Sequence, residues 1–179
     1  MKKKFLTIAI IGIVLLAAVF ATTAYKGYIF KKNCSAYLKL AADAPTIERA
    51  RDFTALALQY IESKNLTKGN TAVFFPTPTT NLELWYGQIK TAYINIVTLI
   101  EQEKINPGSV SQLTKDNVLM KLREVLIDNG DKGVEITVPS NITVYPNQYL
   151  FFIWWLIASI PTFGGWIGYL ILTKKNKRI

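Results

Sequence analysis

The chain contains no histidine and only one cysteine, Cys34, among its 179 residues. Histidine is the most common general base, and with cysteine it supplies most zinc ligands. Its absence argues against Ser-His and Cys-His catalysis and against most zinc sites. A lone cysteine cannot form a disulfide within the chain, so Cys34 is either an isolated small residue or half of an intermolecular disulfide in an oxidising compartment. We expect a protein that is not an enzyme, with no catalytic residue and no cofactor.

Acidic residues are scarce: the chain contains 12 Asp and Glu residues and 21 Lys and Arg residues, which gives a net charge of +9. Such an excess suggests a nucleic-acid partner unless its location explains it otherwise. Residues 26–148 hold all 12 acidic residues and 14 of the basic ones, so the middle of the chain is nearly balanced. We therefore expect no nucleic-acid partner and assign the excess to membrane topology. The seven basic residues at the two ends are Lys2, Lys3, Lys4, Lys174, Lys175, Lys177 and Arg178.

Charge is missing altogether from two long apolar segments, residues 5–24 and 149–173. A helix of about 20 apolar residues crosses the hydrocarbon core of a bilayer, which is about 30 Å thick. We predict two transmembrane helices, two tails at residues 1–4 and 174–179, and one domain at residues 25–148. The first segment also fits a signal peptide, because three lysines precede it and small residues end it. Whether residues 5–24 are retained or cleaved stays open.

The basic residues beside the second apolar segment predict the orientation of the chain. Four of them follow this segment, whereas residues 136–149 before it contain none. Cytoplasmic flanks of transmembrane helices are enriched in Lys and Arg. We therefore expect a two-pass protein of the plasma (inner) membrane, with both termini in the cytoplasm, the central domain extracytoplasmic and the lipid bilayer as a partner.

The first helical pattern of the middle segment lies between residues 35 and 64. It is interrupted at Asp43-Ala44-Pro45-Thr46, where Asp43 can cap a helix and Pro45 fits a first turn. Residues 35–42 are predicted either as a short helix or as a continuation of the first transmembrane helix. From residue 47 onward, one face repeats at helical spacing through Ile47, Ala50, Thr54, Ala57, Leu58 and Ile61.

Two further helices follow. Thr80-Asn81-Leu82-Glu83 has the form of a capping box, and the helix that it begins should end near Ile105, before Asn106-Pro107-Gly108. Residues 111–128 predict the next helix, for which Asn129-Gly130 supplies the stop.

Three short segments, residues 71–75, 133–138 and 142–145, are rich in β-branched or aromatic residues and predict extended chain that pairs in a small sheet. Short linkers make successive helices antiparallel neighbours. The predicted fold class is mainly α: an extracytoplasmic three- or four-helix bundle with short extended segments, flanked by two transmembrane helices.

The apolar segments contain pairs of small residues at a spacing of four. Gly164 and Gly168 form a G-x-x-x-G pattern, and Ala17 and Ala21 give the same step in the first segment. Such pairs let the backbones of two helices approach closely. We predict that these four residues pack helices in the membrane, within one chain or between chains, although glycine is also common in transmembrane helices without this role.

No metal site is predicted, and the one candidate is a calcium site at Asp128, Asp131 and Glu135. These carboxylates lie close together with two glycines. Their spacing departs from that of an EF-hand loop, and Lys132 lies among them. An exposed turn explains the cluster better.

These patterns favour a membrane-anchored, non-enzymatic interaction or scaffold protein that acts as an accessory subunit of a membrane complex. Its expected partner is a membrane protein or a second copy of the chain. One alternative is a ligand sensor that signals through a partner membrane protein. Another is a membrane-bound enzyme that uses carboxylates, which would need a deep pocket where two of them converge, such as Glu48 with Asp128 or Glu135.

Overall fold

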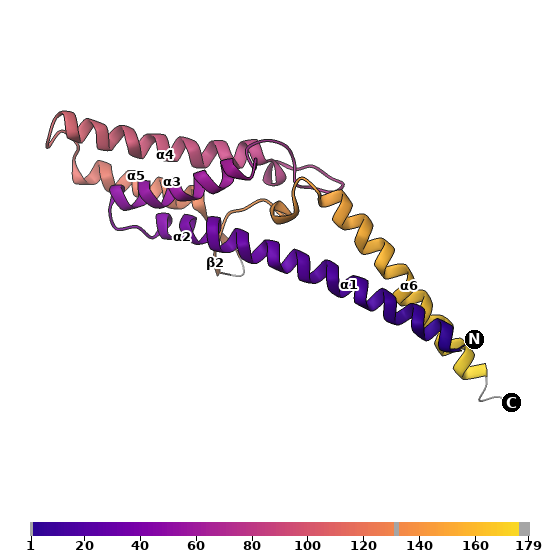
Figure 1. The fold of residues 1–179 in the computed structure, drawn as a ribbon. Helices are drawn as coiled ribbons and strands as arrows, with labels where there is room; N and C mark the ends of the chain where they lie inside the picture. The colour runs from indigo at the N-terminus through magenta and orange to yellow at the C-terminus, as the bar shows by residue number, and fades with distance from the viewer. Residues whose placement is uncertain (1, 131–132, 176–179) are drawn as a thin grey trace. The chain divides into compact units, whose positions relative to one another are not determined.

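The computed structural model describes residues 2–130 and 133–175 and is mainly helical (Figure 1). The chain divides into two compact units. One unit, which we call the helix pair, combines the residues up to Gly27 with those from Pro146 onward. The other, which we call the core unit, comprises Tyr28–Tyr145.

The first helix extends well beyond the predicted apolar segment. Helix α1 (Lys2–Phe30) passes through a π-helical turn, η1 (Lys31–Ser35), into α2 (Ala36–Ala42) without a break in helical backbone. Of the two alternatives predicted for residues 35–42, the structure shows the continuation of the first helix. The last helix, α6 (Gln148–Lys175), contains Pro161 in its interior.

Helix α3 (Ile47–Ser63) confirms the first predicted helix of the middle segment. Its cap is Thr46, whose hydroxyl accepts a hydrogen bond from the backbone N–H of Arg49. The prediction that Asp43 caps this helix and that Pro45 lies in its first turn is wrong. Asp43 instead follows the last residue of α2, and Pro45 lies before the cap.

Helix α4 (Leu82–Ile105) ends where the sequence predicts. Its cap is Asn81, whose side-chain oxygen accepts from the backbone N–H groups of Glu83 and Leu84 at 2.9 and 3.2 Å. The predicted capping box at Thr80 is wrong, because Thr80 closes a separate 3₁₀ turn, η2 (Pro78–Thr80), where its hydroxyl donates to the carbonyl of Thr77.

Helix α5 (Gln112–Leu126) begins after its cap, Ser111. The predicted stop at Asn129-Gly130 is wrong, because the chain leaves the helix at Ile127 to form strand β1 (Ile127–Gly130). This strand pairs antiparallel with β2 (Gly133–Ile136), with Ile127 opposite Ile136. The extended chain predicted at residues 133–138 is thus confirmed in its first part.

The other two segments predicted as extended form no strand. Residues 142–145 contain a 3₁₀ turn, η3 (Ile142–Val144), so that prediction is wrong. In the segment 70–81, only the bridge between Asn70 and Asn81 has strand geometry among the described residues. The predicted pairing of the three segments is therefore replaced by the β1–β2 hairpin.

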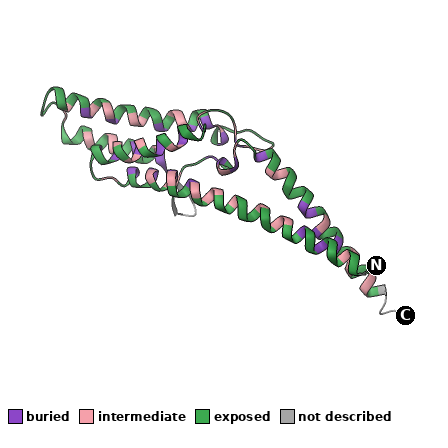
Figure 2. Cartoon of the chain, viewed as in Figure 1, coloured by how far each residue is buried: buried purple, intermediate pink, exposed green. Residues whose placement is uncertain are grey.

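Helices α2, α3, α4 and α5 pack around one hydrophobic core. Figure 2 shows buried positions recurring along these helices. The predicted face of α3 is buried at all six of its positions, which are Ile47, Ala50, Thr54, Ala57, Leu58 and Ile61. Trp85 ties α4 to the segment after β2, because its indole N–H donates to the carbonyl of Thr137 at 2.8 Å.

Candidate functional site

Among residues 2–130 and 133–175, two helices are long and apolar enough to cross a membrane. They are the continuous helix Lys3–Ala42 and the helix Gln148–Lys174. In their most apolar windows only 11% and 17% of the residues are buried. The core helix of a soluble protein buries most of its apolar side chains, as α3 does, so these two helices differ from α3.

Helices α1 and α6 approach closely through small residues. A Cβ atom added to Gly12 would lie 2.6 Å from the backbone nitrogen of Thr162, and one added to Gly165 would lie 2.6 Å from that of Ala9. Ala9 and Ala158 are buried, with 2% and 1% of their surfaces exposed. Contacts of this kind hold apolar helices together by van der Waals packing of their backbones.

The four residues predicted to pack helices differ in their surroundings and in their exposure. Gly168 lies against the ring of Phe5. Gly164, Ala17 and Ala21 are exposed in the single chain, and a Cβ on Gly164 would have no atom within 4 Å. Their role in packing, within or between chains, stays a prediction.

The sequence interpretation overlooked Ala9, Gly12 and Gly165, where the backbones of α1 and α6 approach each other. The signal was present in a second spacing, because Ala158, Thr162 and Gly165 follow one another at steps of four and three residues along one face.

The basic residues expected to set topology lie at the ends of these helices. Lys3, Lys4 and Lys174 are exposed. For Lys2 and Lys175 the structure describes the backbone alone. Lys177 and Arg178 lie outside the described residues.

The calcium candidate is only partly described. Asp128 and Glu135 face each other across the β1–β2 pair, and Asp131 lies outside the described residues. Among the residues that the structure describes, no group of three or more His, Cys, Asp or Glu side chains could hold a metal ion.

The core unit carries a groove of about 570 Å³ between α4 and α5. Its apolar side chains come from both helices, with Leu84 and Ala92 on α4 and Val118, Leu122 and Val125 on α5. Leu84 is about half exposed, and Val118 and Val125 are half-buried. The groove is therefore an open, partly apolar surface between two helices of one core.

Gly87 lies in this groove, in the second turn of α4. Apart from its chain neighbours and the backbone of its own helix, no atom comes within 4 Å of the position that a Cβ would occupy on it. The space beside Gly87 is thus an open notch, and no neighbouring element requires a glycine at this position.

The rim of the groove is polar. Glu83, Gln88, Thr91 and Asn95 line it from α4, and Lys121 and Glu124 line it from α5. Two carboxylates against one ammonium give the rim a small negative excess. Glu48, Asp128 and Glu135, the carboxylates considered for an enzyme, do not line this groove.

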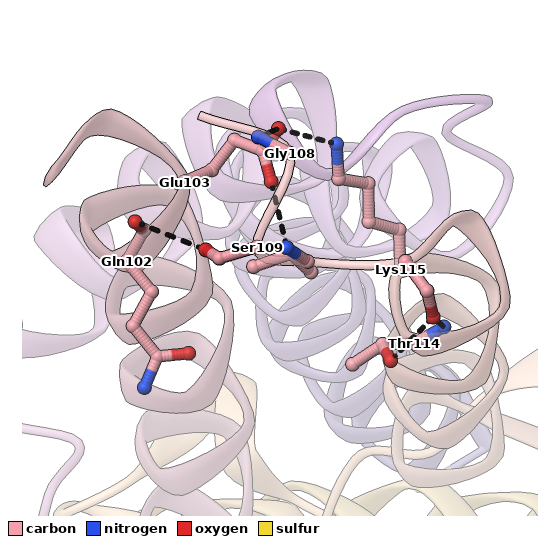
Figure 3. A network of polar contacts seen from close by, with 8 residues as sticks. Gln102, Glu103, Gly108, Ser109, Thr114 and Lys115 are labelled. Carbon is pink, nitrogen blue, oxygen red and sulfur yellow. Dashed lines mark hydrogen bonds and ion pairs between the residues drawn. The ribbon is translucent and has the colours of Figure 1, made fainter. Parts of the chain in front are cut away.

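A polar network joins the end of α4 to the start of α5 (Figure 3). The carboxylate of Glu103 accepts from the backbone N–H groups of Gly108 and Val110, each at 3.2 Å, and lies 3.5 Å from the ammonium of Lys115. The hydrogen bond from Gly108, with help from the Lys115 charge, holds the pKa of Glu103 below its ordinary value. The carboxylate therefore links the end of α4 to the loop that follows it and to the start of α5.

A second exposed polar cluster joins α3 to α4. The hydroxyl of Tyr86 donates to the Glu62 carboxylate, and the Lys90 ammonium lies 3.1 Å from the same carboxylate. These bonds lower the pKa of Glu62, first through Tyr86 and then through Lys90. Because the cluster is exposed and lies outside the groove, we interpret it as a contact between helices.

Cys34 lies in η1 and belongs to the hydrophobic cluster of the core unit, and none of its surface is exposed. Burial raises the pKa of its thiol to about 12. A buried, protonated thiol is a poor nucleophile. The intermolecular disulfide considered from the sequence would therefore require the core unit to open.

No known protein family matches the chain, and no curated protein or solved structure is significantly similar to it.

Proposed function

We propose that this chain is a membrane-anchored, non-enzymatic interaction protein that docks a partner along the α4–α5 groove. In this proposal α1 and α6 are the two passes through the plasma (inner) membrane, and both termini are cytoplasmic. Residues 25–148 then form an extracytoplasmic helical bundle. The partner is a membrane protein of the same complex, for which this chain is an accessory subunit.

Gly87 is the observation that carries the docking proposal. A glycine in the interior of a helix costs about 0.5–1 kcal/mol relative to alanine. Packing does not require this glycine, because a Cβ would meet no atom within 4 Å. Its effect is to open a notch in the groove, and such a notch can receive one large apolar side chain from a helix of the partner.

The rim charges indicate which segment fits. Glu83 and Glu124 outnumber Lys121 among the charged residues that line the groove. Complementary charges steer association and suppress incorrect partners. We therefore expect the docked segment to carry a basic residue beside its apolar anchor.

The anchoring part of the proposal is supported by the two apolar, largely exposed helices and by the basic residues that flank them. Its test is thiol labelling in intact cells, with Asn70→Cys and Asn176→Cys introduced separately into a chain that carries Cys34→Ala. We expect a membrane-impermeant reagent to label position 70 and to leave position 176 unlabelled until the cells are lysed. Labelling of both positions in intact cells would overturn the orientation.

The docking part is tested by photocrosslinking in the same cells. A photoreactive residue at Thr91, inside the groove, should give one discrete adduct, whereas the same residue at Thr98, exposed on α4 outside the groove, should not. Filling the notch by Gly87→Leu should remove the Thr91 adduct. Adducts of equal yield at both positions, or an adduct that Gly87→Leu leaves intact, would refute docking in the groove. An adduct of two copies of the chain would identify the partner as self.

Carboxylate-based catalysis is the second candidate, because Glu83 and Glu124 both line the groove. A complementation assay distinguishes the two functions. Variants are expressed in cells that lack the chain and are tested for restoring the phenotype that is lost without it. Docking predicts that Gly87→Leu fails and that Glu83→Gln and Glu124→Gln, each made alone, restore part of the phenotype, because one rim carboxylate remains to steer the partner. The opposite pattern would favour an enzyme.

A further inference from the structure

A second cavity, of about 450 Å³, lies within the helix pair, between α1 and α6. We call it the crevice. One side is formed by α1 and the other by α6 and the residue before it. Its main apolar residues are Leu15, Ala18, Val19, Leu150, Phe151 and Trp154.

Polar groups gather at one end of the crevice. Asn147 lines it just before α6 begins, and Thr22 lines it from α1. Lys26 follows Thr22 by one helical turn, and its ammonium lies 4.9 Å from the centroid of the Phe151 ring. A cation over an aromatic face is held by the charge distribution of the ring. The crevice thus has an apolar body along α1 and a cation fixed at its mouth.

We propose that the crevice binds one phospholipid with an anionic headgroup. An acyl chain lies along Leu15 and Ala18, and the phosphate lies at Lys26. This inference rests on the proposed function, since it needs α1 and α6 to cross a bilayer, and it adds a specific ligand to that anchor. The polarity of the crevice matches the amphipathic shape of a lipid from end to end.

The cation at the mouth of the crevice favours a lipid over a third helix. A transmembrane helix is predominantly apolar, whereas the phosphate of a lipid carries the negative charge that the Lys26 ammonium calls for. A flexible acyl chain can fill an irregular crevice, and the lipid phosphate pairs with the ammonium.

The test uses the full chain in vesicles of phosphatidylcholine that contain a minor fraction of brominated lipid. Bromine on the acyl chain quenches nearby tryptophan. A variant that keeps Trp154 and replaces Trp85, Trp155 and Trp166 by Phe limits the fluorescence signal to Trp154, which lines the crevice. We expect brominated phosphatidylglycerol to quench Trp154 at a lower mole fraction than brominated phosphatidylcholine does.

Two matched pairs of variants locate the site. Lys26→Gln should reduce the preference for phosphatidylglycerol about fivefold, the effect of one basic residue near an anionic lipid surface, whereas Lys31→Gln should leave it unchanged. Ala18→Leu, which fills the crevice, should reduce quenching by both lipids. Ala24→Leu makes the same change at an exposed position of α1 that does not line the crevice, and quenching should stay as it was.

A second readout avoids the tryptophan substitutions. Photoactivatable phosphatidylglycerol should crosslink the unmodified chain at residues 147–154, and Lys26→Gln should reduce the yield. Equal quenching by both lipids, or a preference that Lys26→Gln leaves intact, would overturn the lipid site while the chain remains inserted. Trp154 shielded from both lipids in an inserted chain would mean that another helix fills the crevice, which also overturns it. A chain that washes off the vesicles with alkaline carbonate would instead refute the membrane anchor itself.

Discussion

Replacing Gly87 by alanine should stabilise the core unit, although this glycine lies in a helix that packs against two others. The methyl group would meet no atom of a neighbouring element within 4 Å, so it would neither clash nor gain a packing contact. What changes is the backbone, since glycine in a helix interior loses more conformational entropy on folding than alanine does. The expected gain is about 0.5–1 kcal/mol in the free energy of unfolding.

A gain of this size raises the melting temperature of a domain of about a hundred residues by roughly 2–6 °C. The assay is thermal unfolding of the full chain in mild detergent, followed by circular dichroism. Gly87→Leu should give a similar gain, because leucine is nearly as good a helix former as alanine and its side chain can extend into the notch. A fall in melting temperature for Gly87→Ala would refute the reasoning, because it would mean that the notch is closed.

The two substitutions become informative when stability and docking are measured together. If both variants are more stable and Gly87→Leu alone loses the Thr91 crosslink, then the natural glycine trades stability for an open notch. Thr98→Leu is the matched control, since it adds the same side chain to an exposed position of α4 outside the groove. It should leave crosslinking intact.

Three further predictions concern the core unit. Cys34 should react with maleimide more than about 100-fold more slowly in the native chain than in denaturant, because its buried thiol must first become exposed; comparable rates would contradict the burial. Glu103→Gln should destabilise the chain at neutral pH, and the difference from the parent should vanish in acid. The folded pKa of Glu103 is lowered, so its stabilisation is present above the unfolded pKa and is lost as the pH falls through the folded value; a difference that persists in acid would refute the charge-based account. Trp85→Phe should cost about 1–3 kcal/mol, because it removes the indole bond to Thr137 and part of a buried ring; denaturant titration measures it, and an unchanged midpoint would show that this bond contributes nothing.

The helices could be predicted from the sequence wherever one face of the helix is buried. The face of α3 repeats at 3.6-residue spacing because one core lies along its whole length, and even its polar member, Thr54, is buried. Its hydroxyl donates to the carbonyl of Ala50 at 2.7 Å, which satisfies the group within the helix. A periodic pattern therefore predicts burial without knowledge of the neighbouring elements.

The helix ends were harder to predict, since neighbouring residues compete as caps. Asn81 and Thr80 can both cap a helix, and the choice falls on Asn81 because Thr80 is already bound into the turn with Thr77. The early end of α5 has a different cause. Ile127 pairs with Ile136, and a partner nine residues away is not visible in the local pattern of a helix.

The site residues show the limit of spacing rules most clearly. Gly164 and Gly165 are adjacent in sequence but point about 100° apart around the helix axis. The sequence identifies Gly164 through its partner at Gly168, yet the backbone of α1 approaches Gly165. Which of the two faces meets another helix depends on how α1 packs against α6, and a spacing rule applied to one helix does not contain this information.

On the proposed topology, the anchor and the groove complement each other energetically. The α4–α5 groove is open and of modest size, and a surface of this kind gives weak binding when two proteins meet in free solution. A partner held in the same membrane is confined near the groove, so its effective concentration there is far above its average in the cell. Under the proposed docking, weak binding then suffices for a stable complex, and we expect the side chain that fills the Gly87 notch to determine which partner stays. Release of the core unit from the membrane should therefore abolish the complex even when the groove is intact.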